Sequence, residues 1–305
     1  MNDVLVIGSL NCDLVMRGPR RPRKGETVMG TAFDVFVGGK GNNQAIAAAR
    51  AGARVSMIGR VGTDGFGDTL LAMLRETGVD TAGVSRDPEV STGVADIFVD
   101  EQGDNSICVA PQANGRLTPS LVEASAALFE RRPVVLLQLE IPLDAVECAV
   151  RLARAAGCPI ILNPAPAPTA GALDHLLSNL DVLVPNETEL AALTGKSSDD
   201  PESGVEELLN RGVGSVVATL GSRGAWLREK GHIGTMIPSH AVEVVDTTAA
   251  GDAFAGAFAA RLAAGDDLRA AARWGVAAGA LACTRLGAEP SLPHLTALRA
   301  LLGDD

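Results

Sequence analysis

The chain alternates short runs of β-branched residues with longer Ala- and Leu-rich segments of helical periodicity. This alternation is typical of a mostly parallel β-sheet with helices on both faces. It predicts strands over Val4–Ser9, Val55–Val61, Val134–Gln138, Ile160–Leu162, Val182–Val184 and Ser215–Thr219. It predicts helices over Asn42–Ala51, Gly67–Thr77, Pro119–Glu130, Asp144–Ala156, Glu187–Leu193, Pro201–Arg211, Asp252–Ala264, Leu268–Thr284 and Pro293–Leu301. We therefore expect an α/β fold with a doubly wound, mostly parallel sheet flanked by helices.

Two stretches, at about 13–37 and 92–109, depart from this rhythm and alternate apolar with polar residues. In the second, Val94–Val99 is followed by turn residues at 100–104, which indicates a hairpin without a helix partner. No linker or internal repeat divides the chain. We expect one domain over 1–305 with these two stretches forming a small β-sheet lid. The alternative is that they add edge strands to the main sheet.

Composition and charge exclude several functions. The 26 Lys and Arg residues against 37 Asp and Glu give a net charge of −11, which disfavours nucleic acid as a partner. The longest uncharged apolar run, Trp274–Cys283, is far shorter than the ~20 residues that span a membrane. The five cysteines form no CxxC pair, so they predict neither a zinc site nor a disulfide framework. We expect a cytoplasmic protein with reduced thiols and no membrane partner.

Two common phosphate-binding signatures are missing. Gly195–Ser197 resembles the end of a P-loop, but Leu190 stands where the first glycine is required. The end of the first predicted strand runs through Val6–Asn11, and this segment contains no GxGxxG turn. The sequence therefore supports neither a Walker-type ATPase nor a dinucleotide-dependent dehydrogenase.

The segment Val244–Phe254 predicts a short strand, a turn of small residues and then a long helix. A helix N-terminus presents unpaired N–H groups, and small side chains let an anion approach them. Asp252 falls in the first turn, after a second acid at Asp246. Asp252 is either an acidic residue favoured by the helix dipole or a functional carboxylate beside a phosphate. The small residues before it favour the second interpretation, in which it is the base of a phosphoryl transfer.

Polar or Gly-rich residues also follow the predicted strands. Val37–Gln44 is a Gly-rich loop that opens a helix, and it suits either a tight turn with an Asn cap or close approach to a polyhydroxylated ligand. Asn186 and Glu189 fit a capping box, which does not exclude a role in a site. The other positions of this kind are Ser9–Asp13, Glu140, Asn163–Pro166 and Thr219–Gly224. Because the carboxyl ends of parallel strands meet at one edge, we expect a ligand site there.

In their order along the chain, these segments resemble the PfkB carbohydrate kinase family over essentially the whole length. The matching segments are Gly8–Asp13, Gly25–Val28, Gly38–Gln44, Ser91–Ala95, Gln138–Glu140, Asn163–Ala167, Pro185–Glu189, Thr219–Gly224, Val245–Asp252 and Thr284–Ser291. Gly251–Asp252 is the most general of these signatures, and the other segments favour the members that phosphorylate ribose. The resemblance implies ATP-dependent phosphorylation of D-ribose at its 5-hydroxyl, giving D-ribose 5-phosphate and ADP.

The resemblance also implies roles for particular residues. Asp252 is the implied general base, with an anion hole formed by Ala249, Ala250 and Gly251. The implied sugar-binding residues are Asn11, Asp13, Gly39, Lys40, Gly41, Asn42, Asn43, Glu140 and Asp252. The implied ATP-binding residues are Asn186, Thr219, Leu220, Gly221, Ser222, Arg223, Gly224 and Gly251. Val276 stands where many relatives have a polar residue near adenine.

Two cations are implied in the same way. Asn186 and Glu189 match the positions that hold Mg²⁺ through water. A K⁺ loop is matched by Asp246, Thr248, Ala282, Arg285, Gly287 and Ser291, which contribute mainly carbonyl oxygens. The alternative for Asp246 is that it only caps a turn or pairs with Arg285.

The sequence also bears on the oligomeric state and on the choice of substrate. An exposed apolar strand edge at Val94–Val99 would invite pairing, so we expect a homodimer that forms through the lid. A related sugar or nucleoside kinase, such as a 2-deoxyribose kinase, would keep the phosphate machinery and differ near the 2-hydroxyl. A sugar-binding regulator without activity is disfavoured because Asp252 and the small-residue turn are both present.

Overall fold

β1 (Asp3–Ile7) lies inside a nine-stranded sheet in a computed structural model that describes residues 3–197 and 199–303. The strand order is β13-β12-β11-β10-β9-β8-β1-β4-β5. The other strands are β4 (Arg54–Gly62), β5 (Asp80–Asp87), β8 (Val134–Leu137), β9 (Ile160–Leu162), β10 (Val182–Leu183), β11 (Ser215–Thr219), β12 (Ala225–Glu229) and β13 (Thr235–Ile237). Strands β11 to β5 are parallel, whereas β12 and β13 add an antiparallel edge.

The order of winding reverses at β1, which pairs with β4 on one side and with β8 on the other. This reversal confirms the predicted doubly wound sheet. Open α/β sheets bind ligands beyond the carboxyl ends of the strands at such a switch point. The residues that follow β1 therefore occupy the position where a ligand is expected.

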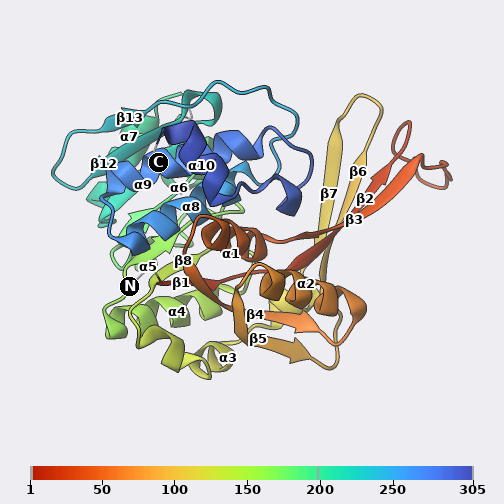
Figure 1. Cartoon of the computed structure of the whole chain (residues 1–305), viewed down its shortest axis with the longest axis horizontal. Helices are drawn as coiled ribbons and strands as arrows, with labels where there is room; N and C mark the ends of the chain where they lie inside the picture. The colour runs from red at the N-terminus through yellow and green to blue at the C-terminus, as the bar shows by residue number, and fades with distance from the viewer. Residues whose placement is uncertain (1–2, 198, 304–305) are drawn as a thin grey trace.

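Helices cover both faces of the sheet (Figure 1). One face carries α1 (Lys40–Arg50), α2 (Gly65–Glu76), α8 (Ala250–Ala264), α9 (Leu268–Ala282) and α10 (Leu295–Leu302). The other carries α3 (Pro119–Glu123), α4 (Leu143–Ala156), α5 (Asp174–Leu177), α6 (Glu187–Thr194) and α7 (Pro201–Asn210). The side chains of β1 alternate between the hydrophobic cores on the two faces of the sheet. Val4 and Val6 belong to the first core, and Leu5 and Ile7 belong to the second.

A separate four-stranded sheet projects from the body (Figure 1). Its order is β3-β2-β6-β7, formed by β2 (Asn11–Arg17), β3 (Ala32–Gly38), β6 (Gly93–Val99) and β7 (Asn105–Ala110). The predicted hairpin is present as the antiparallel pair β6–β7. The alternative that these strands extend the main sheet is wrong, because in the described chain they pair with one another.

The prediction that Val94–Val99 forms an exposed strand edge is wrong. β6 is hydrogen bonded on both sides, to β2 in parallel and to β7 in antiparallel orientation. The edges of the small sheet are β3 and β7. The β2–β6 pairing joins segments far apart in the chain, and periodicity within either segment carries no information about it.

Three further predictions of secondary structure fail locally. The helix over Pro119–Glu130 is broken into α3 and a short 3₁₀ turn at Ala126–Phe129. Val244 and Val245 form no strand, and both are more than half exposed. The strands β5, β12 and β13 are absent from the prediction. β5 and β13 are the edges of the main sheet and β12 lies next to β13, and all three are only partly buried and lack a long apolar run.

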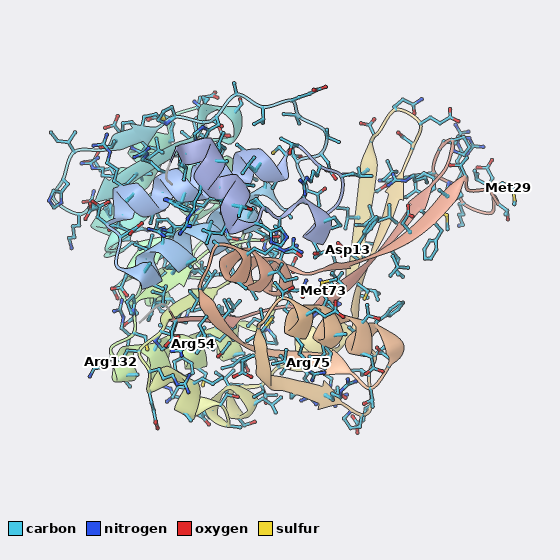
Figure 2. All side chains as sticks on the ribbon, viewed as in Figure 1. Asp13, Met29, Arg54, Met73, Arg75 and Arg132 are labelled. Atoms are coloured by element: carbon cyan, nitrogen blue, oxygen red, sulfur yellow. The ribbon has the colours of Figure 1, made fainter. Side chains whose placement is uncertain are left out.

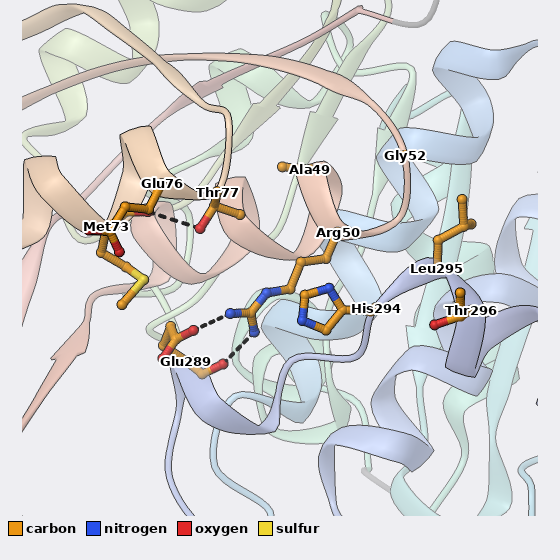
Figure 3. A pocket seen from close by; sticks show the side chains of 10 residues that line it. All are labelled: Ala49, Arg50, Gly52, Met73, Glu76, Thr77, Glu289, His294, Leu295 and Thr296. Atoms are coloured by element: carbon orange, nitrogen blue, oxygen red, sulfur yellow. Dashed lines mark hydrogen bonds and ion pairs between the residues drawn. The ribbon is translucent and has the colours of Figure 1, made fainter.

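A cavity of about 720 Å³ lies between the C-terminal ends of α1 and α2 and the start of α10 (Figure 3). Beside it, the Arg50 guanidinium pairs with Glu289 and also donates to the carbonyls of Glu289 and Leu292. Arg50 thereby ties the end of α1 to the loop that precedes α10. Within residues 3–197 and 199–303, no helix is long and apolar enough to cross a bilayer.

Candidate active site

The first turn of α1 packs directly against the connection between β1 and β2. Gly39 has a φ of 87°, and a Cβ there would lie 2.7 Å from the backbone nitrogen of Asn11. A Cβ on Gly41 would lie 2.6 Å from the backbone nitrogen of Ser9. Real Cβ atoms do not approach so closely, so glycine at these positions lets the helix N-terminus reach the strand end.

Asp252, in the first turn of α8, is 7% exposed and is held by α1. Its Oδ2 accepts from Asn43 Nδ2 at 3.0 Å, and its Oδ1 accepts from Gln44 Nε2 at 2.9 Å. Burial raises the pKa of Asp252, whereas Lys40 and the two amide donors oppose this rise. The result is an oriented carboxylate in a largely dry setting.

A chain of amides supports this carboxylate from behind. Gln138 Nε2 donates to Gln44 Oε1 at 2.6 Å, and Gln44 Nε2 also donates to Asn163 Oδ1 at 3.0 Å. Asn163 in turn donates to the carbonyl of Val184. From the sequence, Gln44 and Asn163 fall in candidate loops, with no role predicted for either one. The sequence indicates that amide side chains follow the predicted strands. It does not indicate which of these amides contact one another.

Lys40 and Glu140, two of the residues predicted to bind a sugar, are brought together. Glu140 Oε2 accepts from Ser9 Oγ at 2.6 Å and from the Lys40 backbone N–H at 3.1 Å. Burial would lower the pKa of Lys40, but the carboxylates of Asp252, Glu140 and Glu189 outweigh burial and raise it. The lysine therefore stays charged among three acids.

Asp13 lies where the small sheet leaves the body (Figure 2). Burial, together with the charges of Glu140 and Asp252, raises the pKa of Asp13 to about 7. Asn11, two residues earlier on β2, is 3% exposed. Successive side chains of a strand alternate between its faces, so Asn11 and Asp13 share one face.

A cavity of about 220 Å³ lies between Lys40, at the start of α1, and the start of α8. It is lined by Lys40, Asn163, Ala165, Val184, Asn186, Glu189, Thr219, Thr247, Ala249, Ala250, Gly251 and Asp252. Asn186 and Glu189 form the predicted capping box, with Glu189 Oε2 accepting from the Asn186 N–H at 2.8 Å. Burial raises the pKa of Glu189, and the hydrogen bond from Asn186 and the charge of Lys40 oppose the rise.

A larger cavity of about 740 Å³ adjoins it, within the size range of small-molecule sites. Of the predicted ATP-binding residues, Asn186, Thr219, Gly221, Ser222, Gly224 and Gly251 line it. Leu220 and Arg223 do not line it: Leu220 is buried in the hydrophobic core, and Arg223 forms an ion pair with Glu187. Val276 lines this cavity. So does the segment Ser239–Val242, which sequence reasoning missed because it has no periodic pattern.

At the start of α8, Ala249 has a φ of 59°, in the left-handed region that non-glycine residues rarely adopt. The Ala250 N–H donates to the Thr247 carbonyl at 3.3 Å. The next N–H groups, those of Gly251 and Asp252, lie in the first helical turn, where no intrahelical acceptor exists. The helix thus presents backbone donors beside the carboxylate of Asp252.

The two segments predicted to hold K⁺ are brought together. Asp246 Oδ2 accepts from the Gly287 N–H at 2.9 Å, and its Oδ1 accepts from Thr248. The Cys283 carbonyl accepts from Val245 and Asp246. Within the described chain, Asp246 makes no ion pair with Arg285, so that alternative for Asp246 is wrong.

A buried carboxylate between a polar cradle and a nucleotide-sized cavity, beside free N–H groups, suits phosphoryl transfer to a small hydroxylated acceptor. The fold and the site thus define a kinase of the sugar-phosphorylating class. Residues 1–295 match the pfkB family of carbohydrate kinases, and the chain belongs to that family.

Relatives with similar sequences include ribokinases and a deoxyribokinase. A ribokinase of Haemophilus influenzae is 39% identical over 94% of each chain. A deoxyribokinase of Salmonella typhi is 35% identical over 96% of each chain. The structure of Arabidopsis thaliana ribokinase complexed with ribose and ATP superposes with a TM-score of 0.93, at 32% identity and 98% coverage of both chains.

Proposed function

We propose that this protein transfers the γ-phosphoryl group of ATP to the 5-hydroxyl of D-ribose, giving D-ribose 5-phosphate and ADP. The observation that carries the proposal is the placement of Asp252 between the Asn43–Gln44 amides and the start of α8. The similarity to ribokinases over nearly the whole chain supports ribose as the substrate.

In this proposal Asp252 is the general base. Its carboxylate takes the proton of the 5-hydroxyl as the hydroxyl oxygen attacks the γ-phosphorus. The bond from this phosphorus to the bridging oxygen breaks, and its electrons leave with ADP. The N–H groups of Ala249, Ala250 and Gly251 form the anion hole, for which the Ala250 N–H must give up its bond to Thr247. Lys40 adds a positive charge beside them.

The sugar lies between the small sheet and the edge of the main sheet. Asn11, Asp13 and Glu140 supply polar side chains, and the small sheet acts as a lid. The Gly-rich turn lets the backbone approach the hydroxyls. That turn comprises Gly39, Lys40, Gly41, Asn42 and Asn43.

ATP occupies the 740 Å³ cavity, and the Asn186 and Glu189 pair suits a hydrated Mg²⁺. Hard oxygen ligands are the donors that Mg²⁺ prefers. Both Glu189 oxygens already accept from Asn186, so the pair would hold the ion through its waters. The ion, when bound, neutralises charge on the phosphates.

The loop around Asp246 also fits a monovalent cation. Among the described residues, the backbone carbonyls of Thr248, Arg285, Gly287 and Ser291 accept no hydrogen bond. Carbonyl oxygens are hard ligands, as an alkali cation requires. Bound K⁺ would stabilise the segment that leads into the anion hole. Dialysed enzyme should turn over faster, and melt at a higher temperature, in potassium than in sodium or tetramethylammonium chloride. Equal rates and melting temperatures in all three salts would contradict the K⁺ site alone.

We further propose a homodimer in the cytoplasm, formed through the small sheet. One face of this sheet exposes the neighbouring side chains Met16, Phe33 and Val35, whereas Ile107 and Val109 are exposed on the opposite face. Contiguous exposed apolar surface commonly marks an interface. The five cysteines are unpaired in the structure, and free thiols persist in a reducing compartment.

The test of the catalytic proposal is an assay of ATP-dependent phosphorylation across pentoses, 2-deoxyribose, hexoses and nucleosides. The kcat/KM for ribose should exceed that for 2-deoxyribose by about tenfold or more. When the 2-hydroxyl is missing, the polar groups of the protein that bind it are left without a hydrogen-bond partner. A preference for 2-deoxyribose would assign the protein to the deoxyribose kinases instead. No phosphorylation of any sugar would overturn the proposed function.

A further inference from the structure

Asn114 lies under the start of the small sheet, outside the set of residues that the proposed function uses. It belongs to the 3₁₀ turn Gln112–Arg116 after β7 and is 1% exposed. Its Oδ1 accepts from the Leu10 N–H at 2.9 Å. Its Nδ2 donates to the Leu10 carbonyl at 3.0 Å and to Asn11 Oδ1 at 2.7 Å. One buried amide therefore joins Leu10, in the connection between β1 and β2, to Asn11, a residue predicted to bind the sugar.

The backbone decides which way this amide faces. The N–H of Leu10 can only donate, and its carbonyl can only accept. Asn114 Oδ1 must therefore face the Leu10 nitrogen, and Asn114 Nδ2 must face the Leu10 oxygen. The reversed orientation would place donor against donor and acceptor against acceptor in a buried setting.

The orientation of Asn114 then determines that of Asn11. Because Asn114 presents a donor, the Asn11 atom that faces it must be Oδ1. The Nδ2 of Asn11 is directed away, and it donates to no group in residues 3–197 and 199–303. Asn11 thus presents a donor on the face of β2 that also carries the carboxylate of Asp13.

The hydrogen bond between Asn11 and Asn114 requires a residue without a side chain at position 93, which is Gly93. It pairs with Asn11 at the start of β6. A Cβ on Gly93 would lie 2.3 Å from both Asn11 Oδ1 and Asn114 Nδ2. Any side chain at this position would therefore break the Asn11–Asn114 hydrogen bond.

We propose that Asn114 is a positioning residue that holds the Asn11 amide with its donor toward the sugar. This rests on the proposed function. A sugar hydroxyl can accept from Asn11 Nδ2 and donate its own proton to Asp13. If Asn11 were reversed, the hydroxyl would face two acceptors with a single proton. Asn114 therefore contributes to ribose affinity without touching ribose.

The experiment is a double-mutant cycle with Asn114→Ala, Asn11→Ala and the double variant. Ribose binding is measured by calorimetry without nucleotide, and ADP binding and the melting temperature are the controls. Asn114→Ala should weaken ribose binding by about tenfold, the equivalent of one lost hydrogen bond in this setting. In the Asn11→Ala background the same change should have almost no further effect, because the residue acts through Asn11. ADP affinity should stay unchanged in every variant.

Asn114→Asp is the second variant, in case the alanine variant does not fold. It keeps the size of the side chain and the acceptor for Leu10, but the ionised carboxylate that it introduces has no donor for Asn11. Ribose affinity should fall in the same direction. An equal loss from Asn114→Ala with and without Asn11, or unchanged ribose affinity in both Asn114 variants, would overturn the proposal. A wild-type protein that binds ADP but not ribose would overturn the proposed function and this inference together.

Discussion

Asp252 is the residue on which the proposed chemistry depends most. We expect Asp252→Asn to fold and bind ATP but to lose about 10²–10⁴ in kcat, the usual effect of removing a general base. The Asn43 and Gln44 amides would then face an amide rather than a carboxylate, so the melting temperature must be measured alongside the rate. A folded variant with a rate within about threefold of wild type would contradict the role of base, given that range.

Asp13 should make ribose binding depend on pH. Its pKa is raised to about 7, so the carboxylate is largely protonated at pH 6 and ionised at pH 8. If the ionised form accepts the hydroxyl protons, ribose affinity should rise about tenfold between these values and then level off. Asp13 has its ordinary, lower pKa in the unfolded chain. The free energy of unfolding should therefore fall as the pH rises from that ordinary pKa toward 7.

Calorimetry of ribose binding without nucleotide, across the range in which Asp13 titrates, measures this dependence. Asp13→Asn is the control and should bind ribose weakly, with the rise near pH 7 removed. The same inflection in Asp13→Asn would assign the titration to another group, such as Asp252, whose pKa is also raised.

At the scale of elements, Arg50 holds the end of α1 to the loop before α10 through an ion pair with Glu289 and through hydrogen bonds to the carbonyls of Glu289 and Leu292. The side chains of Arg50 and Glu289 are each 12% exposed, so removing one partner leaves a charge that is largely buried. Arg50→Met should lower the free energy of unfolding by about 3–5 kcal/mol. The double variant Arg50→Met/Glu289→Met should be more stable than the single one, since no unpaired charge remains.

Urea denaturation measures these changes, with Arg151→Met as a matched control. Arg151 pairs with Glu123 at an exposed position, so its loss should cost less than about 1 kcal/mol. If Arg50→Met and Arg151→Met cost the same, the buried pair does not hold this loop.

At the scale of the whole molecule, the small sheet should join two chains. Light scattering at micromolar concentration should give the mass of two chains. Val35→Asp should give the mass of one chain, because it places a charge in the apolar surface of β3. Ile233→Asp, at a 93% exposed position in the body, is the control and should leave the dimer intact. A wild-type monomer with full activity would contradict the dimer.

Much of the architecture follows from local pattern. The alternation of apolar runs reflects burial on one or both faces, so it predicts the parallel strands, most of the helices and their order. The glycines at 39 and 41 mark places of close backbone approach, because their lack of side-chain bulk is itself the requirement. The small residues before Asp252 instead leave the start of the helix open, since a Cβ on Gly251 would have no atom within 4 Å. These features are contained in short stretches of sequence and need no knowledge of distant neighbours.

Which of these stretches meet is a property of the packed fold. Gln44 and Asp252 are 208 residues apart, and Asn114 is 103 residues from Asn11. The parallel pairing of β2 with β6 also joins distant segments, and Asp246 and Gly287 are 41 residues apart. A hydrogen bond depends on the distance and direction between two atoms, and neither is encoded in local periodicity. Local patterns therefore account for the layers and for the segments that form the site, whereas packing between distant segments orients each polar side chain.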